Sequence, residues 1–298
     1  MSTKTKVLVI FAPTASGKTA LTRELFSTQG SHFILNAEII SADSQAVYKG
    51  MDIGTAKPDE ALQKEIPHHL INLLTPDKQY NVSDFVNAAD IACEEINSRG
   101  QLPVVCGGTG FYIRNFLYGL APTPVSDEKL RNELKKIDPQ SAAKIHPNDA
   151  YRICRALEVY YLCGKPRSSF KAEGQGQLRN KFDFKFIVLE PPRDILYERI
   201  KQRVDQMFDA GLETEVRSLI AKGYTKESPG MKAIGYSEWF ESDDKDQIRQ
   251  AIKHHSCNYA KKQYTYIRDI PGSTIIDFTS SEQEYVKISN IIKSFYKN

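Results

Sequence analysis

Short apolar runs alternate with helical patterns in the first third of the chain. The runs at 7–11, 38–42 and 102–106 are rich in Val and Ile and end in polar or glycine residues, which predicts buried strands. Residues 83–98 repeat apolar side chains at helical spacing, and we expect Ser83 to cap this helix. Strands separated by helices predict a parallel sheet that binds ligands at the carboxyl ends of its strands.

The pattern changes after residue 120. No strand pattern occurs between 120 and 171, where helical periodicity predicts an all-helical insertion. We therefore predict an α/β core formed by 1–118 and 178–298, with a helical insertion domain at 119–177. In the second part of the chain we expect helices at 127–137, 139–145, 149–163, 193–208, 212–222, 237–241, 246–268 and 281–296, and strands at 184–189 and 273–278.

Composition excludes several classes of protein. No apolar run is long enough to cross a membrane, and the N-terminus lacks the apolar core of a signal peptide. The five cysteines are odd in number and contain no C-x-x-C pair, which argues against a disulfide framework and a zinc site. The net charge of +3 does not by itself indicate a nucleic-acid partner. We expect a cytoplasmic protein that has no membrane partner.

The segment after the first strand has the pattern of a phosphate-binding loop. It matches G-x-x-x-x-G-K-[ST] with alanine at the first glycine, and it precedes a helical stretch at 20–26. In such a loop Lys18 reaches the terminal phosphates and the Thr19 hydroxyl ligates Mg²⁺. An ordinary strand–turn–helix is the alternative, and Ala12 would be strained if its position required a left-handed backbone. The residues expected to bind a diphosphate or nucleotide are Ala12, Pro13, Thr14, Ala15, Ser16, Gly17, Lys18 and Thr19.

Two further strand ends carry candidate catalytic groups. Asp43 follows the second strand, where a carboxylate beside a phosphate loop can act as a general base or hold Mg²⁺ through water. Thr109 stands in the glycine-rich turn 107–110 and offers a hydroxyl to the same edge of the sheet. The alternatives are a turn or helix-capping role for Asp43 and a plain strand-to-helix turn capped by Thr109.

Basic residues gather on two of the predicted helices. Arg199 and Arg203 stand four apart, which puts two guanidinium groups on one face, where they could hold a pyrophosphate. The stretch 245–268 combines Lys, Arg and Tyr with an apolar face, so it could contact phosphates and stack on bases. A solvated basic surface is the alternative in both cases. The buried face of this stretch should contain Ile248, Ala251, Ile252 and Tyr259.

Several segments together resemble one family, the tRNA dimethylallyltransferases or tRNA isopentenyltransferases. The most specific is residues 48–58, YKGMDIGTAKP, which a generic kinase would not be expected to share. The resemblance runs in order along nearly the whole chain. The other matching segments are 13–19, 41–45, 67–70, 107–110, 146–149, Arg152, 155–159, 202–207, 234–236 and 259–263.

The resemblance implies a fold and a reaction. It implies a P-loop kinase-like parallel sheet flanked by helices, with an all-helical insertion domain. It implies transfer of a dimethylallyl group from dimethylallyl diphosphate to N6 of adenosine 37, next to the anticodon of tRNA, with Mg²⁺ as the cofactor. We expect a monomer. In the family pattern Asp43 is the base on the adenine amine, Thr109 places that amine, and Arg203 binds the diphosphate.

The resemblance also implies a tRNA-binding surface. Cys257 and Asn258 stand where the family usually has arginines, so we expect some of the family's tRNA contacts to be lost. The insertion between 120 and 148 is shorter than in longer members, so we expect weaker binding of the anticodon stem. The residues at positions that touch tRNA in the family are Asp43, Ser44, Gln45, Ala46, Thr109, Arg131, Tyr151, Arg152, Arg155, Gly235, Tyr236, Lys261, Lys262, Gln263 and Arg268.

Three other functions share parts of this pattern. A small-molecule P-loop kinase has the loop and the architecture but does not need residues 48–58. An RNA-binding NTPase without transferase activity fits the loop and the basic helix. A transferase that prenylates free AMP or ADP is the nearest rival, against which the helical insertion and residues 146–149 favour tRNA.

Overall fold

The computed structural model describes residues 4–120, 134–145, 150–169, 178–265, 270 and 272–297. The chain forms two compact units. One consists of 1–117 together with 179–298, and the other of 118–178. The sequence pattern placed these divisions after residues 118 and 177.

Within the described part of the larger unit, six parallel strands form one sheet in the order β3-β2-β4-β1-β5-β6. This confirms the predicted α/β fold. The pattern analysis missed β3, because its two residues pair with β2 (Ile39↔His68) but are too few to show a periodicity. The strands are β1 (Lys6–Phe11), β2 (Ala37–Ser41), β3 (His68–His69), β4 (Leu102–Gly107), β5 (Asp183–Leu189) and β6 (Thr274–Ile276).

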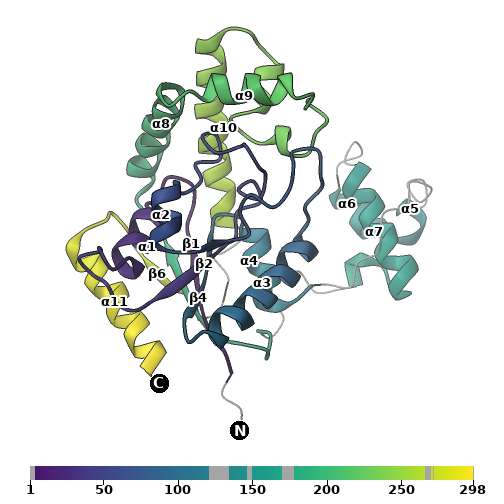
Figure 1. Ribbon diagram of the computed structural model, residues 1–298. Coiled ribbons are helices and arrows are strands. Elements are labelled where there is room, and N and C mark those ends of the chain that lie inside the picture. The colour runs from purple at the N-terminus through teal and green to yellow at the C-terminus, as the bar shows by residue number, and fades with distance from the viewer. Residues whose placement is uncertain are drawn as a thin grey trace. The chain divides into compact units, whose positions relative to one another are not determined.

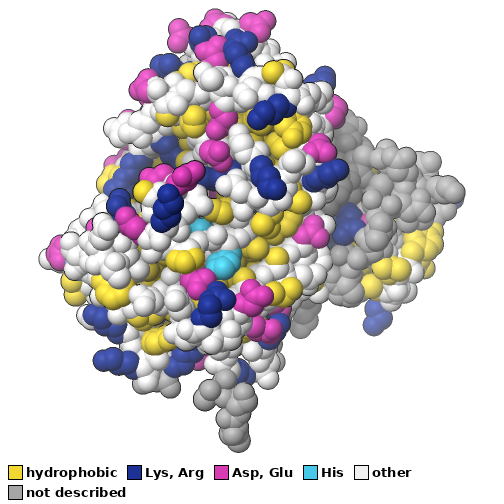
Figure 2. Space-filling view, viewed as in Figure 1, with side chains coloured by type: hydrophobic (Ala, Val, Ile, Leu, Met, Phe, Trp, Pro, Cys, Tyr) yellow, Lys and Arg dark blue, Asp and Glu magenta, His cyan; other side chains and the backbone are white. Residues whose placement is uncertain are grey.

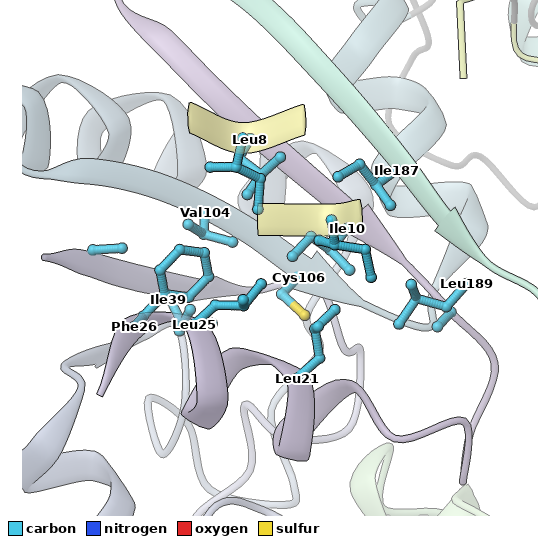
Figure 3. Close-up of a cluster of buried hydrophobic side chains, with 14 of the residues drawn as sticks. Leu8, Ile10, Leu21, Leu25, Phe26, Ile39, Val104, Cys106, Ile187 and Leu189 are labelled. Atoms are coloured by element: carbon cyan, nitrogen blue, oxygen red, sulfur yellow. The ribbon is translucent and has the colours of Figure 1, made fainter. Parts of the chain in front are cut away.

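Helices cover both faces of this sheet (Figure 1). On one face lie α1 (Lys18–Phe26) and α11 (Glu282–Lys297), and on the other lie α3 (Val82–Ser98) and α4 (Gly110–Tyr118). Figure 3 shows the core under α1, where Leu8 and Ile10 of β1 meet Leu21 and Leu25 of the helix. Because both faces are covered, β1 is buried at nearly every position and reads as a continuous apolar run.

A second hydrophobic core joins the segment 48–58 to the helices that follow β5. Met51 packs there with Val216 and Tyr236, and α10 also contacts α8. This packing explains why the motif contains apolar residues between its polar ones. The helices of this region are α8 (Arg193–Asp209), α9 (Leu212–Ala221) and α10 (Lys245–Thr265), with the short 3-10 helices η3 (Gly230–Lys232) and η4 (Ser237–Phe240). The short helix α2 (Glu60–Glu65) instead packs through Leu62 in the core under α1.

The smaller unit is helical in its described residues, as predicted. Its small core contains Leu134, Ala156 and Leu157. Asp138 caps α6 by accepting from the backbone N–H of Ser141 at 3.0 Å, and it also accepts from the N–H of Ser168 at 2.9 Å. The elements are α5 (Leu134–Ile137), α6 (Pro139–Lys144), α7 (Ala150–Cys163) and the 3-10 helix η2 (Arg167–Ser169).

Two local predictions were wrong. The cap of α3 is Asn81, whose side chain accepts from two backbone N–H groups while Asp84 completes the capping box, so Ser83 lies inside the helix. Tyr259 is 37% exposed, because at its level α10 borders a cavity instead of the hydrophobic core; Ala260 is the buried residue there. Among the described helices, none has the length and apolar composition needed to cross a membrane.

Candidate active site

A cavity of about 570 Å³ opens beside the carboxyl ends of β1, β2 and β4. The strand ends supply the loop 14–19, Asp43 with Ser44, and the turn at Gly107 and Gly108. Every residue that lines the cavity belongs to the larger unit. The three candidate segments from three separate strands therefore share one site, where the topology of a parallel sheet predicts ligand binding.

The loop between β1 and α1 has the backbone of an anion-binding turn. Gly17 (φ 87°) and Ala15 (φ 59°) are left-handed, and α1 begins directly after them, so its first N–H groups face the loop. Ala12 is not among the left-handed residues of the described chain. The strain considered for Ala12 is therefore absent, because the left-handed positions of this loop lie three and five residues later.

Lys18 lies inside the loop rather than in solvent. Its Nζ donates to the carbonyl oxygens of Ala12 at 2.8 Å and of Pro13 at 2.6 Å. Burial lowers the pKa of Lys18 to about 8. An anion bound in the loop would favour the charged form of this ammonium group, so Lys18 is suited to bind phosphate oxygens.

This lowered pKa predicts that diphosphate binding weakens as the pH rises above about 8. Below that pH the ammonium is already charged in the free protein. Above it, binding must restore the lost proton, so the dissociation constant for an organic diphosphate should rise by up to about tenfold per pH unit. Titration calorimetry across this range measures the effect. The matched variant Lys18→Met cannot titrate and should bind weakly with a flat profile, whereas a flat profile in the wild type would contradict the role of Lys18.

Arg203 extends from α8 into the same cavity. Its Nη1 donates to the Thr14 hydroxyl at 3.1 Å, and burial lowers the pKa of this guanidinium while the carboxylate of Asp43 raises it. Arg199, one turn earlier, instead donates from Nη2 to the carbonyl oxygen of Thr279 at 2.8 Å and does not line the cavity. Of the two arginines considered for pyrophosphate, the structure places only Arg203 at the site.

Asp43 and Thr109 are held side by side by the turns that follow β2 and β4. The Thr109 hydroxyl accepts from the N–H of Ser44 at 3.0 Å, and one oxygen of Asp43 accepts from the N–H of Gln45 at 2.9 Å. Gly107 permits the close approach, since a Cβ there would lie 2.2 Å from the carbonyl oxygen of Ala42. Asp43 thus makes a turn hydrogen bond, as its alternative role predicted, and also faces the cavity.

The side chains of Gln263 and Tyr236, two of the residues expected to bind tRNA, make hydrogen bonds within the larger unit. Gln263 is 4% exposed; its Nε2 donates to the carbonyl oxygen of Gly108 at 2.6 Å, and its Oε1 accepts from the N–H of Thr14 at 3.1 Å. Tyr236 is completely buried. Gln263 lines the cavity and Tyr236 does not, and contact of either residue with tRNA stays a prediction.

The remaining tRNA candidates lie in several parts of the chain. Ser44, Gln45 and Ala46 line the cavity. Lys261 and Lys262 are exposed near the end of α10. Figure 2 shows Lys and Arg mixed with Asp and Glu over the face in view, so charge alone does not outline a binding surface.

The other candidates lie next to Tyr236, in the smaller unit, or outside the described part of the chain. Gly235 has a left-handed backbone (φ 99°), and its N–H donates to Glu238 at 2.9 Å. In the smaller unit Arg152 is exposed, and Arg155 donates to Glu158 at 2.8 Å. Arg131, Arg268, residues 146–149 and the side chain of Tyr151 lie outside the described part of the chain.

Two cavity lysines were not singled out from the sequence. Lys57 donates through Nζ to Asn72 Oδ1 at 2.6 Å, to Asp52 Oδ1 at 2.7 Å and to the carbonyl oxygen of Tyr48. Its place within the segment 48–58 was the available signal. Lys232 is exposed at the cavity. Neither lysine has a local pattern that distinguishes it from a surface residue.

Metal ligands at the cavity are few. Among the described residues, no group of three or more His, Cys, Asp and Glu side chains is placed to hold a metal ion. The exposed residue Thr19 supplies a hydroxyl there and Asp43 supplies a carboxylate, since both line the cavity. This sparse set of oxygen donors suits Mg²⁺, which keeps several waters and binds substrate phosphates.

Comparisons with known proteins agree on one family. The profile described as IPP transferase matches residues 46–270. The tRNA dimethylallyltransferase 2 of Geotalea daltonii is 38% identical and covers 99% of this chain and 93% of its own length. The crystal structure of the tRNA isopentenylpyrophosphate transferase from Staphylococcus epidermidis has 34% identity, a TM-score of 0.71, and coverage of 98% of this chain and 99% of its own. A eukaryotic dimethylallyltransferase that acts on tRNA has 30% identity and a TM-score of 0.80, and covers 97% of this chain and 79% of its own.

Proposed function

The chain belongs to the family of IPP transferases that includes the tRNA dimethylallyltransferases, and we propose that it transfers a dimethylallyl group from dimethylallyl diphosphate to N6 of adenosine 37 in tRNA. The observation that carries this proposal is the meeting of a diphosphate loop and Asp43 in one cavity, with the Thr109 hydroxyl bonded to Ser44 of the cavity lining. A phosphate site alone would serve a kinase equally well, but the family match and residues 48–58 do not support that alternative.

The reaction joins a weak nucleophile to a reactive carbon. The exocyclic amine of adenine is a poor nucleophile because its lone pair is delocalised into the ring. As the bond between N6 and C1 of the dimethylallyl group forms, the bond between C1 and the diphosphate oxygen breaks, and diphosphate leaves with the electron pair. The proton lost from N6 passes to the Asp43 carboxylate. We assign the role of orienting the amine to the Thr109 hydroxyl, which accepts from the N–H of Ser44.

The cations of the cavity act on the departing diphosphate. Lys18 and Arg203 converge on the loop from α1 and α8, and the guanidinium can bind two phosphate oxygens at once. Because both groups are fixed before the reaction, they stabilise the charge that develops on the leaving group. The phosphate loop thus holds a leaving group and passes no phosphoryl group onward.

We include Mg²⁺ in this proposal. Bound through the Thr19 hydroxyl and the diphosphate oxygens, it would neutralise part of the charge that accumulates as the diphosphate departs. The protein ligands that we propose for Mg²⁺ are the Thr19 hydroxyl and, through water, the Asp43 carboxylate in the same cavity.

The adenosine must leave its stack in the anticodon loop to enter the cavity. The basic end of α10 and the cavity residues 44–46 are the parts of the larger unit that we assign to tRNA. We also propose that the protein acts in the cytoplasm as a monomer.

One experiment separates the candidate functions. The purified protein is incubated with tRNA and either dimethylallyl diphosphate labelled in the prenyl group or ATP labelled in the γ-phosphate, with AMP and ADP as rival acceptors. We expect label from the prenyl donor in tRNA, at a single adenosine of the anticodon loop. Transfer from ATP would establish a kinase, and prenylation of AMP or ADP but not of tRNA would overturn the assigned acceptor.

Lys261→Ala should weaken tRNA binding and flatten its salt dependence. Each phosphate contact releases counterions, so loss of one contact should reduce the slope of log K against log salt by roughly 0.7–0.9. The measurement is the tRNA dissociation constant from low to moderate salt. Lys287→Ala, which removes an exposed lysine of α11, is the matched control and should leave the slope unchanged. Equal slopes in both variants would remove α10 from the tRNA surface.

A further inference from the structure

Glu215 of α9 makes four hydrogen bonds that join distant parts of the larger unit. Its Oε2 accepts from the backbone N–H groups of Asp52 at 2.9 Å and Ile53 at 2.8 Å. Its Oε1 accepts from the N–H of Gly54 at 3.2 Å and from the hydroxyl of Tyr236 at 2.6 Å. One carboxylate therefore holds the turn 52–54 and the segment before η4 at the same time.

Tyr236 packs tightly against the turn that Glu215 holds. Its side chain is fully buried, and a Cβ on Gly54 would lie 2.5 Å from its ring. Burial, followed by the neighbouring Glu215, raises the pKa of Tyr236, so its hydroxyl remains a hydrogen-bond donor. The two glycines also bring the backbones together, since a Cβ on Gly235 would lie 3.5 Å from the Cα of Gly54. A larger residue at Gly54 would push the segments apart, and a larger residue at Gly235 would strain its left-handed backbone (φ 99°).

The two fastened segments form part of the cavity surface. Residues 54–58 line the cavity from one segment, and residues 232–234 line it from the other. Glu215 and Tyr236 themselves are not among the lining residues. They act on the site only through the backbone that they hold.

Hydrogen bonds connect Glu215 to Lys57, which lines the same cavity as the proposed general base Asp43. Asp52 donates its N–H to Glu215 and accepts through its carboxylate from Lys57 Nζ at 2.7 Å. Lys57 and Asp43 both line the cavity. The wall fastened by Glu215 therefore faces the same cavity as Asp43, while Lys18 and Arg203 are bonded to the phosphate loop.

We propose that Glu215 and Tyr236 are positioning residues that fasten residues 52–58 and 232–236 into one wall, and that this wall orients the acceptor adenosine against Asp43. The inference rests on the proposed function, because it assigns the wall to the tRNA side of that reaction. It separates the cavity into a diphosphate side, organised by the loop, and an acceptor side, organised by Glu215.

The test uses two variants that retain the size of the side chain. Glu215→Gln places an amide N–H₂ against one pair of donors, and Tyr236→Phe removes only the hydroxyl. Because misplaced reacting groups are slow to react, we expect kcat with saturating tRNA to fall by about 10- to 100-fold in each variant. The dissociation constant for inorganic pyrophosphate should stay within about twofold, since the loop is not bonded to Glu215. The double variant should be no slower than Glu215→Gln alone.

If Glu215 and Tyr236 only stabilised the fold, the variants would contain less folded protein but each folded molecule would react at the wild-type rate. Rates are expressed per pyrophosphate-binding site, so loss of folded protein does not lower them. The single tryptophan, Trp239, donates to the carbonyl oxygen of Gly235 at 3.0 Å and reports on the wall through its fluorescence, which should become easier to quench in both variants. Glu213→Gln removes a carboxylate of the same helix that pairs with Arg217 and Lys245, and it should leave kcat unchanged.

The outcomes separate this inference from the proposed function. If the wild type prenylates tRNA and both variants keep their kcat within about twofold, the positioning role is overturned. It is also overturned if pyrophosphate binding weakens by the same factor as the rate falls, because Glu215 and Tyr236 would then act on the phosphate loop and not on the acceptor side. A wild type that prenylates no tRNA would overturn the proposed function itself.

Discussion

Asp43→Asn should lower the rate of prenyl transfer by about 10²- to 10⁴-fold at saturating substrates, which is the usual contribution of a general base. The amide cannot accept the proton from N6, but its oxygen can still accept from the N–H of Gln45, so the turn after β2 should persist. Binding of tRNA and of pyrophosphate should change little. Single-turnover rates with labelled dimethylallyl diphosphate measure the chemical step directly.

A matched variant tests whether the effect is specific. Asp243→Asn removes an exposed carboxylate just before α10 and should leave the rate unchanged. If Asp43→Asn retains a rate within about threefold of the wild type, well short of the usual contribution of a base, then Asp43 is a turn residue and the proton goes elsewhere.

Arg203→Ala should lower kcat by about 10²- to 10³-fold, because it removes a fixed cation from the departing diphosphate. The substitution also leaves the Thr14 hydroxyl without its donor, so affinity for dimethylallyl diphosphate should fall as well. Arg203→Lys should restore part of the rate, since it keeps the charge but loses the two-pronged geometry. Initial rates at varied dimethylallyl diphosphate and saturating tRNA separate kcat from KM.

The same helix provides the control for this experiment. Arg199→Ala removes a guanidinium one turn away that is bonded to the carbonyl oxygen of Thr279, outside the cavity. Its rate should stay within about twofold of the wild type. Equal losses in Arg199→Ala and Arg203→Ala would show a general electrostatic effect of the basic helix instead of a specific contact with the leaving group.

The elements with long or strongly periodic patterns were predictable from the sequence. The structural bounds of β1, β4, α3 and α8 lie within one or two residues of the predicted ones. The two-residue β3 was missed, since it is too short for a periodicity to appear. The helix cap was misplaced by two positions, because Ser83 and Asn81 are both good capping residues and only the backbone geometry distinguishes them.

What the sequence determined by itself is local. The phosphate loop, Asp43 and the glycine-rich turn at Thr109 each occupy a few consecutive residues at a strand end, so a short pattern predicts both their chemistry and the edge of the sheet on which they lie. The tertiary structure decided what supports them. Gln263 meets Thr14 across 249 residues, and Glu215 meets Ile53 across 162. Periodicity shows which face of a helix is buried but not against which partner, so it could not show that Gln263 bonds to Gly108 and Thr14 or that Tyr236 bonds to Glu215.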